Sequence, residues 1–410
     1  MATYYVSKAG NDSNAGTAKS APKLTIASAI SSVTHGDTVE ILDQGTYAED
    51  DLSINYNGLT FTHTASELGR AKINAGGNSH AFEFSNVTGT VFRGLEIYNC
   101  SNYALHNNSQ AQRTFHITGC FFHDINKLTF KAIEGNGTSG PNAREPATIF
   151  ESIIYGDNQG NFSAPILVDG RLYIRNSFIT ASTDGYVIKN YAGTNTTASF
   201  STFINRHAST TYPVVQATKV INCIVSGSSS NLKGLACDNG SHTYNLVNVG
   251  GTNFRNLADN ANGSTGTGEI TGQMPIFIDG GAIGNSANIV GNYNLQSSSP
   301  AIGAGAAYNS INIDISGTTR PQGAAFDIGC FEYISSSPAW TDYGTQPDPN
   351  FSGEFTINTY NNLTSNYKLS NSENPGQVPF SLGAAGPATI RQRSTAYSVT
   401  KGDDPSKAIT

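Results

Sequence analysis

A phrase of four residues recurs along the middle of this chain and constrains its fold more than any other feature. Its first residue returns after steps of 25, 32, 25, 25, 21 and 22 residues. A repeat of about 20–50 residues is typical of a stacked solenoid. Because the copies are rich in β-branched and aromatic residues, they predict a parallel β-helix rather than helical repeats. The seven copies are Gly94-Leu95-Glu96-Ile97, Gly119-Cys120-Phe121-Phe122, Glu151-Ser152-Ile153-Ile154, Asn176-Ser177-Phe178-Ile179, Ser201-Thr202-Phe203-Ile204, Asn222-Cys223-Ile224-Val225 and Tyr244-Asn245-Leu246-Val247.

The four positions of the phrase predict different environments. Side chains alternate along a strand, so the second and fourth positions share a face and are expected to fill the coil. The second position is small or sulfur-containing in most copies, and the fourth is always large and apolar. The third position is also mostly apolar, at Phe121, Ile153, Phe178, Phe203, Ile224 and Leu246. Two interpretations are open: the strand bends so that these side chains also face inward, or they form an outward stripe buried against a neighbouring subunit, which predicts a homotrimer.

Two further segments bracket the repeats. One begins Tyr4-Tyr5-Val6-Ser7 and continues through Gly45-Thr46-Tyr47; the other runs from Ser299-Pro300-Ala301-Ile302 to Asp327-Ile328-Gly329-Cys330 and ends at Tyr333. Together they resemble the opening and closing segments of the right-handed parallel β-helix superfamily, which includes pectate-lyase-like and phage-tailspike-like coils. The resemblance implies an all-β, single-stranded coil with a capping helix at about residues 23–33. It implies no single activity, since the superfamily also contains glycoside hydrolases and adhesins.

These marks predict three regions: an N-terminal cap and first rung over 1–50, a parallel β-helix over 51–334, and an irregular extension over 335–410. The extension begins with Ser335-Ser336-Ser337-Pro338, whose composition is that of a linker. Strands are possible at Glu354 to Ile357 and at Asn366 to Leu369. Because the extension lacks a core of its own, we expect an assembly or attachment arm rather than a disordered tail.

Composition limits the partners. The 410 residues carry a net charge of -7, and 13% are charged. No cluster of Lys and Arg predicts contact with nucleic acid, and no apolar run reaches the roughly 18 residues that span a bilayer. Five cysteines without metal-binding spacing predict buried free thiols, with a Cys100–Cys120 disulfide as the alternative.

We expect no export signal in the residues before the Tyr4 segment, because Met1 leads directly into it. We therefore expect either a bacteriophage virion protein, made in the host cytoplasm, or a secreted chain whose signal was removed.

Two sets of residues are candidates for catalysis. Loops on a coil are where sites are built, and the extra residues of the 32-residue step lie near Asp124, Lys131 and Glu134. A second set is Asp169, Arg171, Asp184 and Lys189. The alternative for both sets is that their charged side chains lie on the surface in contact with water and have no catalytic role. Neither shows a repeated acidic column, so no metal site is predicted, and Ca²⁺ enters only if the protein is a lyase.

Three ring-bearing residues follow the phrase in successive copies and are expected to point outward: Tyr98, His123 and Tyr155. A stripe of rings can stack on the faces of sugars, for example those of a host surface glycan. Ordinary packing between rungs is the alternative.

Three functions compete. The favoured one is a bacteriophage virion structural protein (a spike, fibre or capsid decoration) that contacts other virion proteins through its extension. The alternatives are a polysaccharide lyase or tailspike-type glycoside hydrolase, and a secreted bacterial adhesin or stalk. Whether the chain is an enzyme is left open.

Overall fold

The computed structural model describes residues 1–334 apart from 64–68, 79, 86, 108–114, 134–146, 157–165, 170, 184, 191–194, 208–210, 228, 238–240, 257–261 and 280–291. Within 335–410 it describes 377–380, 398–401 and 408–409. The chain divides into two compact units, Met1–Tyr333 and Ile334–Thr410.

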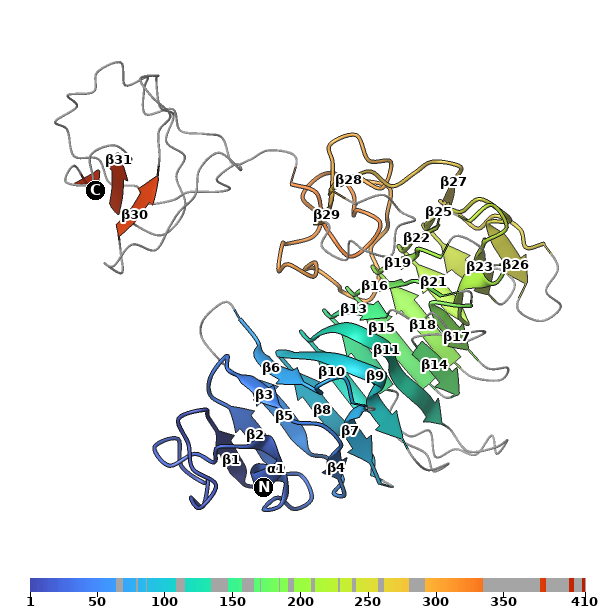
Figure 1. Ribbon diagram of the computed structural model, residues 1–410. Coiled ribbons are helices and arrows are strands. Elements are labelled where there is room, and N and C mark those ends of the chain that lie inside the picture. The colour runs from blue at the N-terminus through green and yellow to red at the C-terminus, as the bar shows by residue number, and fades with distance from the viewer. Residues whose placement is uncertain are drawn as a thin grey trace. The chain divides into compact units, whose positions relative to one another are not determined.

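The first unit is a parallel β-helix whose rungs are built from three faces (Figure 1). The first face is one sheet whose described strands are β1 (Thr3–Val6), β2 (Thr38–Ile41), β5 (Thr60–His63), β8 (Thr90–Arg93), β10 (Phe115–Thr118), β12 (Ala147–Phe150), β15 (Arg171–Arg175), β18 (Asn195–Ser199), β21 (Lys219–Ile221) and β24 (His242–Thr243). The second and third faces are continuous because β9 (Leu95–Asn107) and β11 (Phe121–Ile133) each run through both. The predicted fold class is therefore confirmed.

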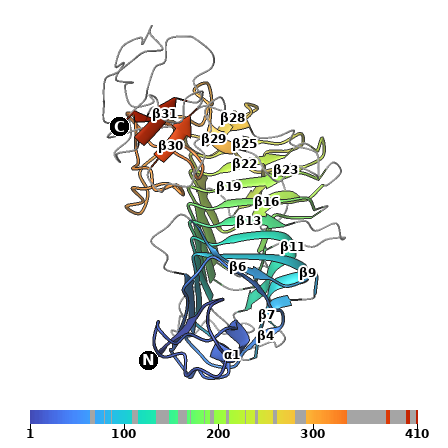
Figure 2. The same ribbon diagram turned by 60° about the vertical axis from the view of Figure 1, so that its left-hand side comes forward.

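The remaining strands of the coil stack in the same parallel way (Figure 2). Besides the first halves of β9 and β11, the second face contains β3 (Thr46–Ala48), β6 (Ala71–Asn74), β13 (Ile153–Gly156), β16 (Phe178–Ala181), β19 (Thr202–Asn205), β22 (Ile224–Gly227), β25 (Leu246–Asn248) and β27 (Ile270–Thr271). The third face contains the second halves of β9 and β11. Its other strands are β4 (Leu52–Ile54), β7 (His80–Phe84), β14 (Ile166–Asp169), β17 (Ile188–Asn190), β20 (Pro213–Gln216), β23 (Lys233–Cys237) and β26 (Phe254–Asn256).

The predicted capping helix is present but short. Helix α1 spans Ile26–Ile30, and the Thr25 side chain caps it by accepting a hydrogen bond from the Ser28 N–H. Its buried side chains, Ile26 and Ala29, belong to the coil's core. Among the described residues, no helix is long and apolar enough to cross a membrane.

A column of left-handed residues turns the chain from the first face to the second. The residues and their φ angles are Gly94 (64°), Gly119 (63°), Glu151 (52°), Asn176 (46°), Phe200 (46°), Asn222 (53°) and Tyr244 (56°). Each donates its backbone N–H to the carbonyl that precedes the corresponding residue of the next rung; Gly94, for example, donates to Thr118 at 3.1 Å. The opening position of the phrase is thus a corner, where Gly and Asn adopt positive φ most readily.

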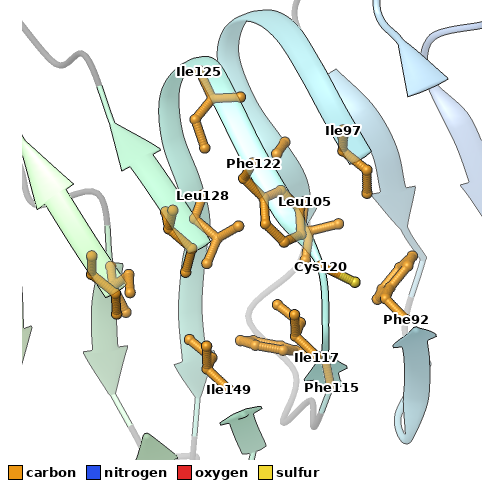
Figure 3. Packing of buried hydrophobic residues seen from close by; sticks show 14 of the residues in the cluster. Phe92, Ile97, Leu105, Phe115, Ile117, Cys120, Phe122, Ile125, Leu128 and Ile149 are labelled. Carbon is orange, nitrogen blue, oxygen red and sulfur yellow. The ribbon is translucent and has the colours of Figure 1, made fainter. Parts of the chain in front are cut away.

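The second and fourth positions of the phrase fill the coil, as predicted. Small polar members of the second column hydrogen-bond between rungs: the Cys120 N–H donates to Ser152 Oγ at 3.2 Å, and the Ser177 N–H donates to Ser201 Oγ at 3.2 Å. Figure 3 shows Phe122 and Ile97, paired in the fourth column, among the packed side chains of the core.

The fifth copy of the phrase differs from the prediction by one residue. Phe178 pairs with Thr202, and Ile179 pairs with Phe203. Phe203 is therefore inside the coil, fully buried, rather than in the outward column. A one-residue shift moves every side chain of a strand to the opposite face, and here the corner residue is Phe200 instead of Ser201.

The rest of the third column points outward, but the chain itself covers most of it. We call the described residues of 277–333 the cover; it includes the antiparallel strands β28 (Phe277–Asp279) and β29 (Asn292–Leu295). Phe178, Ile224 and Leu246 are buried in one apolar cluster with cover residues. The cover's members are Phe277, Tyr293, Leu295, Ala301, Ile328 and Cys330. Phe121 and Ile153 lie at the edge of this cluster and are only partly buried.

Polar side chains of the corners hold the cover in register. Asn222 donates from Nδ2 to the Ala306 carbonyl at 2.7 Å and accepts from the Ala306 N–H at 2.9 Å. Asn176 Nδ2 donates to the Ile313 carbonyl at 2.7 Å. Burial of the outward stripe therefore gives no argument for a second subunit, and the homotrimer stays a prediction.

The five cysteines are buried and form no disulfide with one another. Cys100 and Cys120 belong to the coil's core. Burial raises the pKa of Cys120 to about 11 and that of Cys100 to about 12, so neither thiol is a reactive thiolate at neutral pH.

The described part of the second unit is a three-stranded sheet of β30 (Gln377–Phe380), β31 (Ser398–Lys401) and β32 (Ala408–Ile409). The strands expected at residues 354–357 and 366–369 lie outside the described residues. A role for the extension in assembly stays a prediction.

Candidate functional site

Two rings stack on the outward side of the second face where the cover does not reach. Tyr98 of β9 and His123 of β11 are partners in the strand register, each one residue after the inward-facing fourth position. Their ring centroids are 4.8 Å apart and the planes differ by 9°. The separation is that of neighbouring strands, so the parallel register itself makes the stack. Two of the three predicted sugar-contacting residues are thus brought together.

Carboxylates on two sides fix the orientation of the His123 ring. Its Nδ1 lies 2.8 Å from Asp124 Oδ2, and its Nε2 lies 3.3 Å from Glu96 Oε1. The side chains of His123 and Glu96 are each 19% exposed, while that of Asp124 is 61% exposed. Because both ring nitrogens face carboxylates, neither is positioned as a free base toward a ligand.

Cationic and apolar groups border the stack. Lys72 of β6 is the register partner of Glu96. The Arg70 Nε donates to the Gly119 carbonyl at 2.8 Å, and its guanidinium lies 6.0 Å from the centre of the Phe121 ring. Phe121 in turn lies 4.5 Å from His123, measured between ring centroids. The surface therefore combines ring faces, carboxylates and cations, the groups that bind the apolar face and the hydroxyls of a sugar.

Tyr155, the third predicted ring, packs against other side chains instead. It is 9% exposed and makes edge contacts with Phe121 at 5.5 Å and Phe178 at 5.9 Å. Burial raises the pKa of Tyr155 to about 12. Here the packing interpretation holds, because the cover reaches this rung and takes the place that a ligand would need.

The structure describes only part of the first set of predicted catalytic residues. Asp124 occupies the corner between the second and third faces with φ 48°, whereas Lys131 lies near the end of β11. Seven residues of extended strand separate positions by about 23 Å, so these two are not neighbours. The side chain of Lys131 and all of Glu134 lie outside the described part of the structure.

The second predicted set is divided between faces. Arg171 begins β15 on the first face, while Asp169 and Lys189 belong to strands of the third face. The Lys189 ammonium lies 5.4 Å from the centre of the Tyr186 ring, an ordinary surface contact. Asp184 lies outside the described residues. Across the residues that the structure describes, no group of three or more His, Cys, Asp and Glu side chains is arranged to hold a metal ion.

Glu96 and Arg70 were not predicted as site residues. A signal for Glu96 was present in the sequence, because it is the single acidic residue at the third position of the seven copies of the phrase. Arg70 lies outside every copy, and no pattern distinguishes it.

Comparison with known proteins finds structural matches but no family. No family model matches the chain, and no curated protein matches it. Among solved structures, the pectate lyase Pel9A is 14% identical with a TM-score of 0.40, over 81% of this chain and 96% of that one. A rhamnogalacturonan lyase is 12% identical with a TM-score of 0.29, over 61% of this chain and 70% of that one.

A third structure, the GH136 lacto-N-biosidase from Eubacterium ramulus, is 9% identical with a TM-score of 0.30, over 66% of this chain and 67% of that one. Likeness at these TM-scores carries no argument about the fold or the activity of this chain. The β-solenoid fold of the chain is shown by the parallel pairing of its own strands.

Proposed function

We propose that the protein is carbohydrate-active and binds a polysaccharide chain on the outward side of β6, β9 and β11. The observation that carries the proposal is the partly exposed stack of Tyr98 and His123, in which the carboxylates of Glu96 and Asp124 hold the His123 ring. The part of these rings that stays exposed can pack against the C–H face of a pyranose, and the flanking carboxylates accept hydrogen bonds from its hydroxyls. The site uses groups that the fold already aligns, so little ordering is needed on binding.

Replacing Tyr98 by alanine is expected to weaken binding by about 1–2 kcal/mol, or roughly five- to thirtyfold, because a central ring contact is lost. The measurement is affinity electrophoresis against a panel of neutral and acidic polysaccharides, followed by calorimetry on those that retard the protein. Tyr173→Ala is the matched control, since Tyr173 is a partly exposed ring on the first face. Equal effects of the two substitutions would contradict the assignment of the site.

Cleavage of the bound chain is the second candidate function, and the partly exposed carboxylate of Glu96 favours it. Glu96 lies beside the ring stack and opposite Lys72 in the register, so it is placed to exchange a proton with a bound sugar. Wild-type protein is then expected to release new chain ends from the polysaccharide that it binds. Glu96→Gln is expected to lower that rate at least a hundredfold while binding persists. Binding without products would leave the protein a carbohydrate-binding one.

We also propose two biological contexts in which such a binding site would be used. A bacteriophage spike, fibre or decoration protein and a secreted surface protein would both use such a site on a glycan of the host or the environment. The homotrimer and the attachment role of residues 335–410 are proposals that the native mass of the full-length and truncated chains would test.

A further inference from the structure

The imidazole of His123 contacts one carboxylate with each of its ring nitrogens. Its Nδ1 lies 2.8 Å from Asp124 Oδ2, at the corner that follows on its own strand, and its Nε2 lies 3.3 Å from Glu96 Oε1 on β9. The ring also contacts Tyr98 and Phe121, with centroid distances of 4.8 and 4.5 Å. Rotation of the ring therefore changes at least one of these contacts. We call Glu96, His123 and Asp124 the His123 cluster.

Only a protonated ring donates a hydrogen bond to both carboxylates of the His123 cluster. A neutral imidazole carries one N–H, so its other nitrogen presents a lone pair. An ionised carboxylate is an acceptor only, so this lone pair and the carboxylate oxygen that it faces repel each other. With both carboxylates ionised, the cluster is therefore complete when His123 carries two protons, and it loses one hydrogen bond when His123 carries one.

The neighbouring strands bring two cations and a phenol to the cluster. Lys72 of β6 is the register partner of Glu96, and no ion pair joins these two side chains, both of which the structure describes. Arg70 precedes β6 and donates to a backbone carbonyl. Both cations oppose a positive charge on His123, but the carboxylates contact the ring directly. Tyr155 of β13 stays neutral below pH 8, because burial raises its pKa to about 12.

We propose that Asp124 is a positioning residue for the sugar-binding surface, and that protonation of His123 sets the affinity for the polysaccharide, with tighter binding at acidic pH. This inference rests on the proposed function and adds pH control to the same site. The protonated ring keeps itself and both carboxylates in place, so less ordering is needed on binding. Histidine is the residue type that ordinarily changes charge between about pH 5 and 8. Because binding and protonation are linked, the bound polysaccharide in turn favours the protonated ring.

The test is calorimetric binding at pH 5.5 and pH 8 to galactomannan, xyloglucan, polygalacturonate and any polysaccharide of the panel that retards the protein. The first two carry no titratable group, and the carboxylates of the third stay ionised over this range. The wild type is expected to bind at least one of them about fivefold more tightly at pH 5.5, the effect of one hydrogen bond. At intermediate pH, calorimetry in buffers of different ionisation enthalpy is expected to show proton uptake on binding.

Asp124→Asn is the variant that separates a positioning role from a merely structural one. Asp124 has φ 48°, and Asn adopts this left-handed conformation readily, so the corner is expected to fold. In the variant, a neutral ring can donate from Nε2 to Glu96 and accept at Nδ1 from the side-chain amide, so both contacts survive deprotonation. The difference in affinity between the two pH values is expected to fall below about twofold.

His35→Asn is the matched control for the loss of pH dependence. His35 is an exposed histidine near the N-terminal end of the coil, where its Nδ1 accepts from the Asn57 N–H at 2.9 Å. This variant is expected to keep the pH dependence of the wild type. The same pH dependence in Asp124→Asn as in the wild type would overturn the inference.

Nitrogen NMR of the His123 ring gives a readout that needs no polysaccharide. Both ring nitrogens are expected to carry a proton at pH 5.5, and one bare nitrogen at that pH overturns the inference. Equal affinity of the wild type at pH 5.5 and pH 8 also overturns it, while the proposed function stands. If the wild type binds no polysaccharide at either pH, the proposed function itself fails.

Discussion

Replacing Glu332 by leucine is expected to destabilise the first unit by about 3–5 kcal/mol, because it leaves the Arg320 guanidinium buried without its carboxylate. Arg320 Nη1 and Glu332 Oε2 are 2.9 Å apart, and both side chains are fully buried. The pair also organises the cover: Arg320 Nη2 donates to the Gly329 carbonyl at 2.8 Å, and Glu332 Oε1 accepts from the Gln322 N–H at 2.9 Å. Thermal unfolding followed by circular dichroism measures the effect.

The surface pair of Lys19 and Glu40 provides the matched control. Its Nζ–Oε1 distance is 2.8 Å, but the Lys19 side chain is 61% exposed. Lys19→Met is expected to leave the unfolding midpoint almost unchanged, since the Lys19 ammonium is exposed to water and an ion pair with an exposed partner contributes little. The double variant Arg320→Met, Glu332→Leu is expected to be less destabilised than the sum of the two single variants. Equal midpoints for Glu332→Leu and the wild type would contradict the burial of this pair.

Phe122→Ala is expected to cost about 3–5 kcal/mol, whereas Phe121→Ala is expected to cost clearly less. The two phenylalanines are neighbours on one strand and point to opposite sides. Phe122 is fully buried inside the coil, and Phe121 points outward at the edge of the cover, where it is only partly buried. Urea denaturation of both variants gives the two free energies of unfolding. A larger effect for Phe121→Ala would reverse the assignment of inside and outside on the second face.

The repeating phrase predicted the coil because each of its positions has a physical role. The corner requires positive φ, the second position must be small, and the fourth must fill the interior. The predicted alignment of the fifth copy is wrong by one residue, because the corner residue is Phe200 and an aromatic residue is unusual in the left-handed conformation. The next residues, Ser201 and Thr202, match the first two positions of the phrase and so favour the wrong alignment. The hydrogen-bond register distinguishes the predicted alignment, in which Phe178 matches Phe203, from the observed one, in which Phe178 pairs with Thr202.

The contact between the cover and the second face could not be predicted from the sequence for a different reason. The described residues of the cover contain little regular structure, so no periodic pattern shows which face they contact. The third position is visible in the sequence as an apolar column, but the sequence leaves open whether the strand bends inward there or another subunit covers the column. Contacts such as that between Asn176 and Ile313 join residues 137 positions apart, and local patterns do not report such pairs.

For the site, position within the repeat was informative and residue type alone was not. Tyr98 and His123 follow the phrase in successive rungs, so the parallel register places them together. Tyr155 occupies the same position one rung later and is buried, because the cover begins there. The stacked rings of His80, Tyr103 and His106 were not predicted because they lie on the third face, where no repeated phrase marks the register.

The cover also changes how the coil should unfold. In a simple solenoid each rung contacts only its neighbours, so stability is a sum of local terms and the rungs open progressively from an end. Here one segment is bonded to three rungs, through Asn176, Thr202 and Asn222. None of these rungs can open without releasing the segment that holds the others. We therefore expect amide hydrogen exchange in β16, β19 and β22 to proceed as one cooperative unit, and that in β3 and β6, which have no such bridge among the described residues, to be graded along the coil.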